Sequence, residues 1–244
     1  MTQFTELQEK QFGLVESHLI EVQQGKRIFM MVPQAAEALG LLQAAAGKAG
    51  FDLQLVSAYR SFERQHQIFT AKAEGRRPLL DDNGVELAFD RLSDAQRLRA
   101  IMRWSAVPGL SRHHWGTDVD VFDANTMALQ DVQLVPAEVD DGGPSAAMHD
   151  WLDERIANNA SYGFFRPYQF DRGAIAPERW HLSYLPAAAE LQCQMDRDVA
   201  LNLLQGESVP FCDILASRLD DIWERFVTVE PEGQPEWVKA ALLV

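Results

Sequence analysis

Cysteine is scarce in this sequence, and long apolar runs are absent. Only Cys193 and Cys212 among the 244 residues carry a thiol, and no Cys-x-x-Cys pair is present. We therefore expect two free, packed thiols instead of a disulfide or a cysteine metal site. The first residues lack the basic and apolar regions of a signal peptide, and no stretch approaches the length of a membrane span. We expect no membrane insertion and a cytoplasmic protein, unless another delivery route brings it to the periplasm or the outside of the cell.

Positive charge is scarce as well. The 22 lysine and arginine residues are outnumbered by 36 aspartate and glutamate residues, which gives a formal net charge of −14. This charge opposes attraction to nucleic acid phosphates and to anionic membrane surfaces, so neither is an expected partner. With 47% hydrophobic and 24% charged residues, the composition is that of an ordinary soluble globular protein.

Hydrophobic spacing in the first part of the chain predicts helices around one strand. Apolar residues recur at helical intervals over 12–22 and again over 38–45. Residues 51–59 alternate in the manner of a strand, and Ser61 is well placed to cap the helix that follows. Residues 76–92 contain the turn signals of a long loop or hairpin, which we expect to border a substrate cleft.

The second part of the chain predicts two further strands and a helical end. Alternating β-branched residues over 117–122 indicate a strand with Asp118 and Asp120 on one face, and 180–184 indicates another. Ser145 is expected to cap a helix, and Leu215, Leu219, Ile222 and Phe226 form the apolar stripe of a C-terminal one. The prediction is an α+β protein with a small antiparallel sheet, flanking helices and a helical C-terminal extension.

Two short segments carry candidate metal ligands. Residues 111–120 read SRHHWGTDVD, and residues 178–181 read ERWH. Zinc prefers imidazole and carboxylate ligands, and a catalytic site supplies three of them while leaving a fourth position for water. His113, Asp120 and His181 fit that requirement. The sequence therefore predicts one zinc ion per chain on the small sheet.

The spacing of these residues requires two local departures from regular strand. His113 and Asp120 are seven positions apart, so one strand could not aim both at a single ion, and Gly116 offers the bend between them. Glu178, a candidate base for the bound water, lies three residues before His181 and is expected in the loop that Pro177 helps to form.

Other polar residues near these segments have two readings each. Ser111 could bind substrate or orient the first ligand, and His114 could support the ligands or face the substrate. Asp118 and Asp123 are the nearest competitors of Asp120, and either could instead be a solvated charge at the strand end. Gln65 could be functional or only pack, and Arg166 could meet a substrate carboxylate or belong to an aromatic-rich core.

Three motifs in this order resemble the signatures of a known enzyme family. Ser-x-His-x-x-Gly-x-x-x-Asp over 111–120, Glu-x-Trp-His over 178–181, and Ser-Ala-Tyr-Arg-Ser-Phe over 57–62 with Gln65 resemble those of the D-alanyl-D-alanine metallopeptidases. That family includes vancomycin-resistance D,D-carboxypeptidases and D,D-dipeptidases and phage L-alanyl-D-glutamate endopeptidases. It shares its zinc fold with lysostaphin-type enzymes and the hedgehog amino-terminal domain. The resemblance covers roughly residues 35–185.

The resemblance implies a role for each motif residue. It makes His113, Asp120 and His181 the zinc ligands, Glu178 the catalytic base, and Arg60 the group that binds the carbonyl oxygen. A fixed guanidinium can stabilise the charge that develops there, whereas the alternative for such an arginine is a surface salt bridge.

Second-tier candidates for substrate contact are the motif residues and their neighbours: Ser111, Gln65, His114, Asp118, Trp180 and Arg166. Two positions depart from the family pattern, because Asp118 stands where Ala is common and Arg179 where Pro is common. Neither departure removes a ligand.

We therefore expect a zinc peptidase domain over 1–185 and a helical extension over 186–244 packed on it. The expected reaction is hydrolysis of a peptidoglycan-derived peptide containing D-amino acids, with release of terminal D-alanine. L-alanyl-D-glutamate cleavage and D,D-dipeptidase action are the alternatives within the family. A non-catalytic, zinc-stabilised binding module is the alternative of another class, although such a module needs neither Glu178 nor Arg60. The oligomeric state is left open.

Overall fold

A four-stranded antiparallel sheet forms the centre of the computed structural model, which describes residues 3–82 and 84–243. Its strand order is β3-β4-β6-β5, and a separate hairpin pairs β1 with β2. This sheet and the helices around it confirm the α+β class and the small antiparallel sheet predicted from the sequence. The strands are β1 Ile20–Gln24, β2 Arg27–Met31, β3 Leu53–Ser57, β4 Asp118–Asp123, β5 Phe164–Phe165 and β6 His181–Tyr184.

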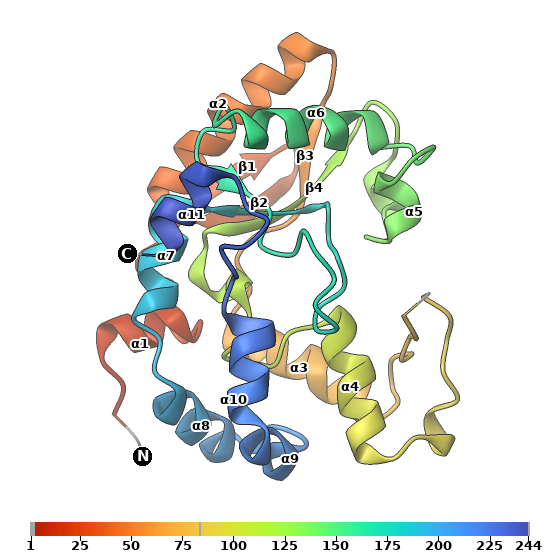
Figure 1. The fold of residues 1–244 in the computed structure, drawn as a ribbon, viewed down its shortest axis with the longest axis vertical. Helices are drawn as coiled ribbons and strands as arrows, with labels where there is room; N and C mark the ends of the chain where they lie inside the picture. The colour runs from red at the N-terminus through yellow and green to blue at the C-terminus, as the bar shows by residue number, and fades with distance from the viewer. Residues whose placement is uncertain (1–2, 83, 244) are drawn as a thin grey trace.

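Helices surround the sheet and form most of the C-terminal part (Figure 1). Short 3₁₀ turns and one π turn connect or extend them: η1 Phe89–Arg91, η2 Arg112–Trp115, η3 Leu129–Asp131 and the π turn η4 Trp223–Val227. The helices are α1 Glu6–Gln11, α2 Pro33–Ala49, α3 Phe62–Ala73, α4 Asp94–Trp104, α5 Pro136–Val139, α6 Ala146–Ala157, α7 Leu185–Cys193, α8 Arg197–Gly206, α9 Cys212–Ser217, α10 Leu219–Ile222 and α11 Glu236–Leu242.

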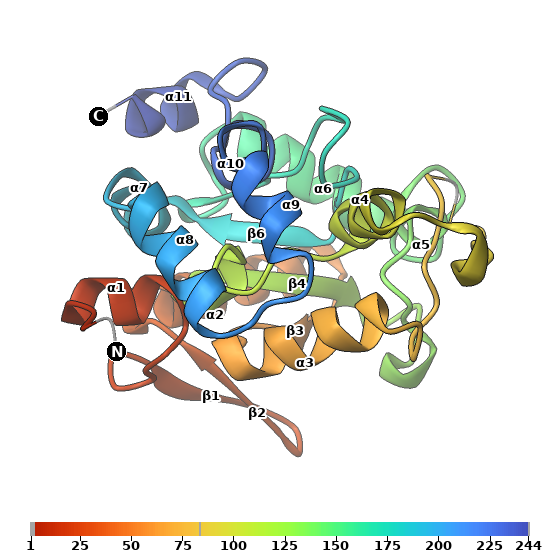
Figure 2. The same cartoon turned by 90° about the horizontal axis from the view of Figure 1, so that it is seen from below.

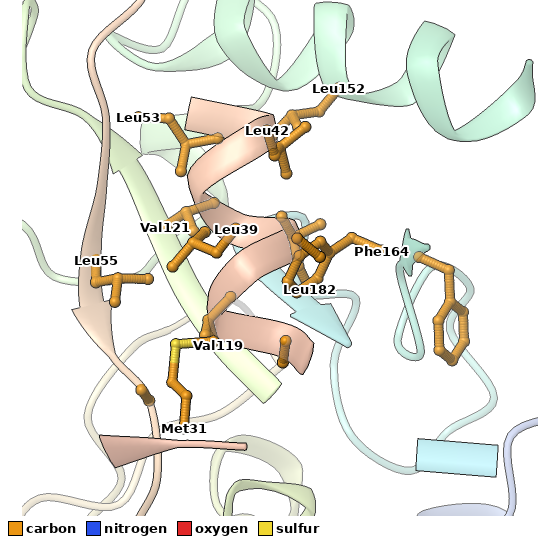
Figure 3. Close-up of a cluster of buried hydrophobic side chains, with 14 of the residues drawn as sticks. Met31, Leu39, Leu42, Leu53, Leu55, Val119, Val121, Leu152, Phe164 and Leu182 are labelled. Carbon is orange, nitrogen blue, oxygen red and sulfur yellow. The ribbon is translucent and has the colours of Figure 1, made fainter. Parts of the chain in front are cut away.

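One face of the sheet is apolar and packs against α2 and α6. Strand periodicity sends Val119 and Val121 of β4 to this face, where they meet Leu55 of β3 and Leu182 of β6 in one buried cluster. Figure 3 shows these side chains beside Leu39 of α2. Burial of each such side chain stabilises the fold by about 1.5–3 kcal/mol. The opposite face of β4 and β6 is therefore left for the polar residues Asp118, Asp120 and His181.

A second apolar cluster joins the C-terminal helices to α3 and α4. Leu203 of α8, Leu215 of α9 and Trp223 of η4 are buried together with Phe69 of α3 and Ile101 of α4. These helices occupy the lower part of Figure 1, and Figure 2 shows β4 between β3 and β6. The C-terminal helices thus share a core with residues from the middle of the chain. A boundary at residue 185 between two domains stays a prediction.

The prediction of a helix over 12–22 is wrong. Helix α1 ends at Gln11. Gly13 then adopts a left-handed conformation at φ 70°, which a right-handed helix cannot continue through. A glycine stands there because a residue with a side chain would be strained. The later part of the predicted segment forms β1 instead. Here the apolar spacing of about 3.6 residues arises from a turn followed by a hairpin strand, and no helix forms.

Two predictions for the C-terminal half also need correction. The continuous helix expected through Leu215 and Phe226 is interrupted at Arg218, and the π turn buries Trp223 and Val227 more deeply than Phe226. Ser145 precedes α6 as predicted, but its side chain does not cap that helix. The Ser145 hydroxyl instead accepts a hydrogen bond from the backbone of Asp123 at 3.2 Å.

The remaining expectations concern thiols and membranes. Both cysteines are free, as predicted, but Cys193 is exposed and only Cys212 is partly packed. In the described ranges, none of the helices has the length and apolar character that crossing a bilayer requires.

Candidate metal centre

Strand register brings three polar side chains from three strands together. Asp120 of β4 pairs with His181 of β6 on one side and with Ser57 of β3 on the other. Directly opposed residues of antiparallel strands have their side chains on the same face. The Ser57 hydroxyl accordingly donates a short hydrogen bond to Asp120 Oδ2. Asp120 therefore sits between a hydroxyl donor and an imidazole.

A β-bulge makes the Ser57 contact possible. Leu55 pairs with Val121, yet Ser57 pairs with Asp120, so two steps along β3 correspond to one step along β4. Without this extra residue, Ser57 would point to the apolar face with Leu55, because side chains alternate along a strand. The bulge turns it to the polar face.

His113 reaches the same place from the turn before β4. It lies in η2, and Gly116 follows with a left-handed φ of 70°, which reverses the chain direction between the histidine and Asp118. The bend predicted at Gly116 is confirmed. The Nδ1 atom of His113 is 2.8 Å from the backbone carbonyl oxygen of Ala58. Because a carbonyl only accepts, Nδ1 carries the proton and Nε2 is left with a free lone pair.

The ligand atoms of His113, Asp120 and His181 all lie within 4.8 Å of one another, and all three residues are buried. His113 Nε2 is 3.4 Å from Asp120 Oδ2, and His181 Nδ1 is 3.4 Å from Asp120 Oδ1. Asp120 Oδ1 is buried and has no hydrogen-bond partner among the described residues. Two imidazole nitrogens and a carboxylate facing one point are a donor set that fits Zn²⁺ with an open position.

Asp118 holds His181 from behind. Its Oδ1 is 2.9 Å from His181 Nε2, and the Arg112 Nε donates to the same oxygen at 2.9 Å. Burial alone would raise the pKa of Asp118, but the charge of Arg112 and the hydrogen bond with His181 lower it to about 2. The ionised carboxylate accepts from His181 Nε2, so Nδ1 is the nitrogen that faces Asp120.

The charges of the candidate ligands and their neighbours shift one another's pKa values. Burial opposes charge on His181, but hydrogen bonds to Asp118 and Glu178 and the charge of Asp120 raise its pKa to about 9. Burial likewise opposes ionisation of Asp120, yet His113 and His181 hold its pKa well below the usual range. The site therefore keeps a carboxylate ionised among imidazoles, as a cation site requires.

Glu178 lies beside the candidate ligands at the end of an irregular segment. It precedes the turn into β6, so the loop predicted for it is confirmed. Its Oε2 is 3.4 Å from His181 Nδ1, and its side chain remains 14% exposed. Glu178 is thus within reach of the ligand cluster and still open to the solvent side.

Arg60 lines the same cleft from the corner between β3 and α3. Ser61 caps α3 by accepting from the backbone N–H of Arg64, as predicted, and the Arg60 backbone N–H donates to the His113 carbonyl at 3.0 Å. The Arg60 Nη1 donates to Gln65 Oε1 at 2.8 Å, and Gln65 Nε2 donates to the Ala106 carbonyl at 2.6 Å. Burial lowers the pKa of Arg60, whereas the charges of Asp120 and Glu178 favour its cationic form. Gln65 fixes the guanidinium.

Arg60, Glu178 and the three candidate ligands line one cleft of about 800 Å³. Ser111 and Trp180 lie on its wall with Arg60 and Glu178, where a substrate could touch them. The loop predicted to border a cleft does so, because Leu80 is also part of the wall.

Four second-tier candidates are not part of the wall of that cleft: His114, Arg166, Asp118 and Gln65. His114 is fully buried, donates to the Arg60 carbonyl at 2.6 Å and accepts from Gly109 at 3.0 Å, and burial lowers its pKa to about 3. Arg166 is buried against Asp153, which accepts from its Nε at 2.6 Å. With Asp118 hydrogen-bonded to His181 and Gln65 to Arg60, all four occupy supporting positions.

The sequence analysis did not identify several groups that support the candidate ligands. Arg112 pairs with Asp118 in a fully buried ion pair, Ser57 contacts Asp120, and the Ala58 carbonyl holds His113. Ser57 and Ala58 lie in the motif next to Arg60, so proximity to it was the available signal. Lys72, which also lines the cleft, carried no signal beyond its place seven residues after Gln65.

Comparison with known proteins identifies a matching family. Residues 29–187 match the family model described as VanY, D-alanyl-D-alanine carboxypeptidase. An uncharacterized protein of Haemophilus influenzae is 31% identical over 124 residues, covering 50% of this chain and 92% of that protein. The D-alanyl-D-alanine carboxypeptidase of Enterococcus faecalis is 28% identical over 134 residues, covering 54% of this chain and 39% of that protein.

Solved structures of similar proteins are more distant. VanYB in complex with D-alanine-D-alanine has 22% sequence identity and a TM-score of 0.49, covering 71% of this chain and 82% of that one. The LdcB LD-carboxypeptidase has 23% identity and a TM-score of 0.49, covering 87% of this chain and 80% of that one. At these sequence identities and TM-scores, the solved structures do not support assigning a role to any residue of this chain.

Proposed function

The chain belongs to the VanY D-alanyl-D-alanine carboxypeptidase family, and on this premise we propose that it removes the terminal D-alanine from a peptidoglycan-derived peptide. His113, Asp120 and His181 would hold one Zn²⁺ for this reaction. The observation that carries the proposal is the convergence of His113 Nε2, Asp120 and His181 Nδ1 in the wall of a cleft, with Glu178 Oε2 3.4 Å from His181 Nδ1.

Glu178 is the proton carrier in this mechanism. When bound, zinc polarises the carbonyl of the scissile bond and lowers the pKa of a nearby water towards ~7. Glu178 accepts a proton from the attacking water while the water oxygen forms a bond to the carbonyl carbon. It then donates that proton to the amide nitrogen as the C–N bond breaks, which releases D-alanine as the amine. The carboxylate is regenerated after each turnover.

Arg60 stabilises the charge that gathers on the carbonyl oxygen. Its guanidinium lines the cleft and is held by Gln65. A positioned donor acts most strongly where it needs no reorganisation during the reaction, and the hydrogen bond from Gln65 to the Ala106 carbonyl supplies that rigidity. Gln65 is a positioning residue in this proposal.

The presence of Glu178 and Arg60 in the cleft favours an enzyme over a structural metal site. A structural zinc site closes its coordination shell with protein ligands, and it has no use for a carboxylate base or an oxyanion donor. Here the ligand cluster borders a cleft of about 800 Å³, which has room for a peptide.

Mass spectrometry of the products tests the proposal directly. Muropeptides and D-Ala-D-Ala dipeptide are incubated with zinc-loaded protein, with chelated protein, and with the Glu178→Ala variant. Glu154→Ala, at an exposed position of α6, is the matched control and should behave as the wild type. Zinc-dependent loss of one terminal alanine supports the proposal.

The other products identify the alternatives. Hydrolysis of the free dipeptide indicates a D,D-dipeptidase, and a cut between L-alanine and D-glutamate indicates an endopeptidase. Absence of every zinc-dependent product would contradict the proposed peptidase reaction and favour the non-catalytic binding module.

A further inference from the structure

Two cations on the wall of the cleft lack a carboxylate partner. Within the described parts of the chain, Arg60 and Lys72 form no salt bridge, although both are only partly exposed and line the cleft. Two other buried or half-buried arginines do have such a partner, since Arg112 pairs with Asp118 and Arg103 with Asp171. Partly buried charges are normally paired, and this chain has 36 acidic residues against 22 basic ones. Arg60 and Lys72 thus present their charges to the cleft with no described carboxylate at salt-bridge distance.

The geometry of α3 explains how Lys72 comes to face the cleft. Gln65 and Lys72 are seven residues apart, close to two helical turns, so they lie on the same face of the helix. The rise of an α-helix puts them about 10 Å apart along its axis. Gln65 holds Arg60 beside the candidate ligands, and Lys72 lies further along the same wall.

The charges around Lys72 make it ready for an anion. Burial lowers the pKa of Lys72 to about 8, the neighbouring charges of Arg77 and Arg60 act in the same direction, and Glu178 opposes them. An approaching carboxylate would relieve this repulsion and restore the charged form. Lys72 thus lies where three basic groups concentrate positive potential in an otherwise acidic molecule.

We propose that Lys72 binds a carboxylate of the substrate and thereby selects peptides that carry a negative charge near the scissile bond. This inference rests on the proposed peptidase function. Two groups of such a peptide could supply the carboxylate: the free C-terminus of the departing residue, or an acidic side chain further along the peptide. The chemistry at Lys72 is the same for both, and the experiment separates them.

The test compares three peptides that differ only in charge: one with a free C-terminus and an acidic side chain, one with the C-terminus amidated, and one with the side chain amidated. For each peptide, kcat and KM are measured with wild type, Lys72→Met, Lys72→Arg and Lys48→Met. Lys48 is exposed on α2 and does not line the cleft, so it is the matched control.

Loss of a charged hydrogen bond costs about 1.5–3 kcal/mol, so Lys72→Met should lower kcat/KM about 10- to 100-fold for the doubly acidic peptide. The fall should appear mainly in KM, and Lys72→Arg should restore most of it. The amidated peptide that is insensitive to Lys72→Met identifies the recognised carboxylate. An equal fall for all three peptides would indicate a structural role and overturn the inference, as would no fall at all.

A failure of the proposed function gives a different pattern. If wild-type protein cleaves none of the peptides, the peptidase proposal fails, whereas Lys72 can still be judged from calorimetric binding of the same peptides. A preference for the carboxylate that Lys72→Met abolishes supports anion recognition. Equal affinity for acid and amide overturns it.

Discussion

Asp118 accepts a hydrogen bond from His181 at 2.9 Å, with both side chains buried. The contact turns the other imidazole nitrogen towards the candidate metal position. Asp118 is one of the two positions where the sequence departs from the family pattern, in which Ala is common there. Asp118 therefore connects the metal site to the buried guanidinium of Arg112, and it has no contact with the cleft.

Asp118→Asn should weaken zinc binding. Loss of such a supporting carboxylate typically lowers metal affinity by about 10- to 100-fold, because the imidazole is less firmly oriented and less basic. Removing the negative charge also leaves Arg112 buried without its ion-pair partner, which should cost about 3–5 kcal/mol of unfolding free energy. Chelator competition measures the first effect and urea unfolding the second. Asp198→Asn, exposed on α8, is the control; an unchanged zinc affinity for Asp118→Asn would contradict the orienting role.

Glu178→Ala should keep zinc and lose turnover. The ligand atoms remain, while the group that transfers the proton is gone, so kcat should fall by about 10²- to 10⁴-fold. Metal analysis and kcat measured on the same preparation check both halves. Retained turnover would remove Glu178 from the mechanism.

Removing a ligand should abolish the effect of zinc on stability. Zinc stabilises the fold through preferential binding to it, by about 2.7 kcal/mol at a free concentration 100 times Kd. Melting curves with zinc and with chelator should therefore differ for wild type and coincide for His181→Ala. A zinc-dependent melting temperature in that variant would show that the metal binds elsewhere.

Arg60→Ala should lower kcat with a small effect on KM. Deletion of one oxyanion donor costs about 10²- to 10³-fold in kcat. Gln65→Leu should produce a smaller fall in kcat, because the guanidinium stays in the cleft without its hydrogen bond. Steady-state kinetics of both variants would decide the matter, and a change confined to KM would instead indicate ground-state binding by Arg60.

KM for a carboxylate-bearing peptide should rise above pH 8. The pKa of Lys72 is lowered to about 8 by burial, Arg77 and Arg60, against the opposing charge of Glu178. Below this pH the lysine is charged and binds the anion, and above it the charge is lost. Lys72→Arg should keep KM flat across the same range, because arginine stays protonated. An identical rise in KM for wild type and Lys72→Arg would assign the titration to another group.

The polar motifs predicted most of this site, whereas the apolar spacing predicted less of the fold. His113, Asp120 and His181 carry the side chains that zinc prefers, and the structure brings them together. The spacing over 12–22 was misleading, because a 3.6-residue period over a short window cannot distinguish a helix from a turn followed by a strand. Gly13, whose left-handed backbone ends α1, lies inside that window.

The amino-acid sequence by itself determined the kinds of ligand, the bend at Gly116, the helix cap at Ser61 and the alternation that separates the two faces of β4. These depend on side-chain chemistry and on neighbours within a few residues. Only the tertiary structure decided that Ser57 turns to the site, that Asp118 lies behind His181 and that Lys72 reaches the cleft. Each of these depends on strand register, a bulge or helix packing, which bring together residues far apart in the chain and so leave no signature in local sequence.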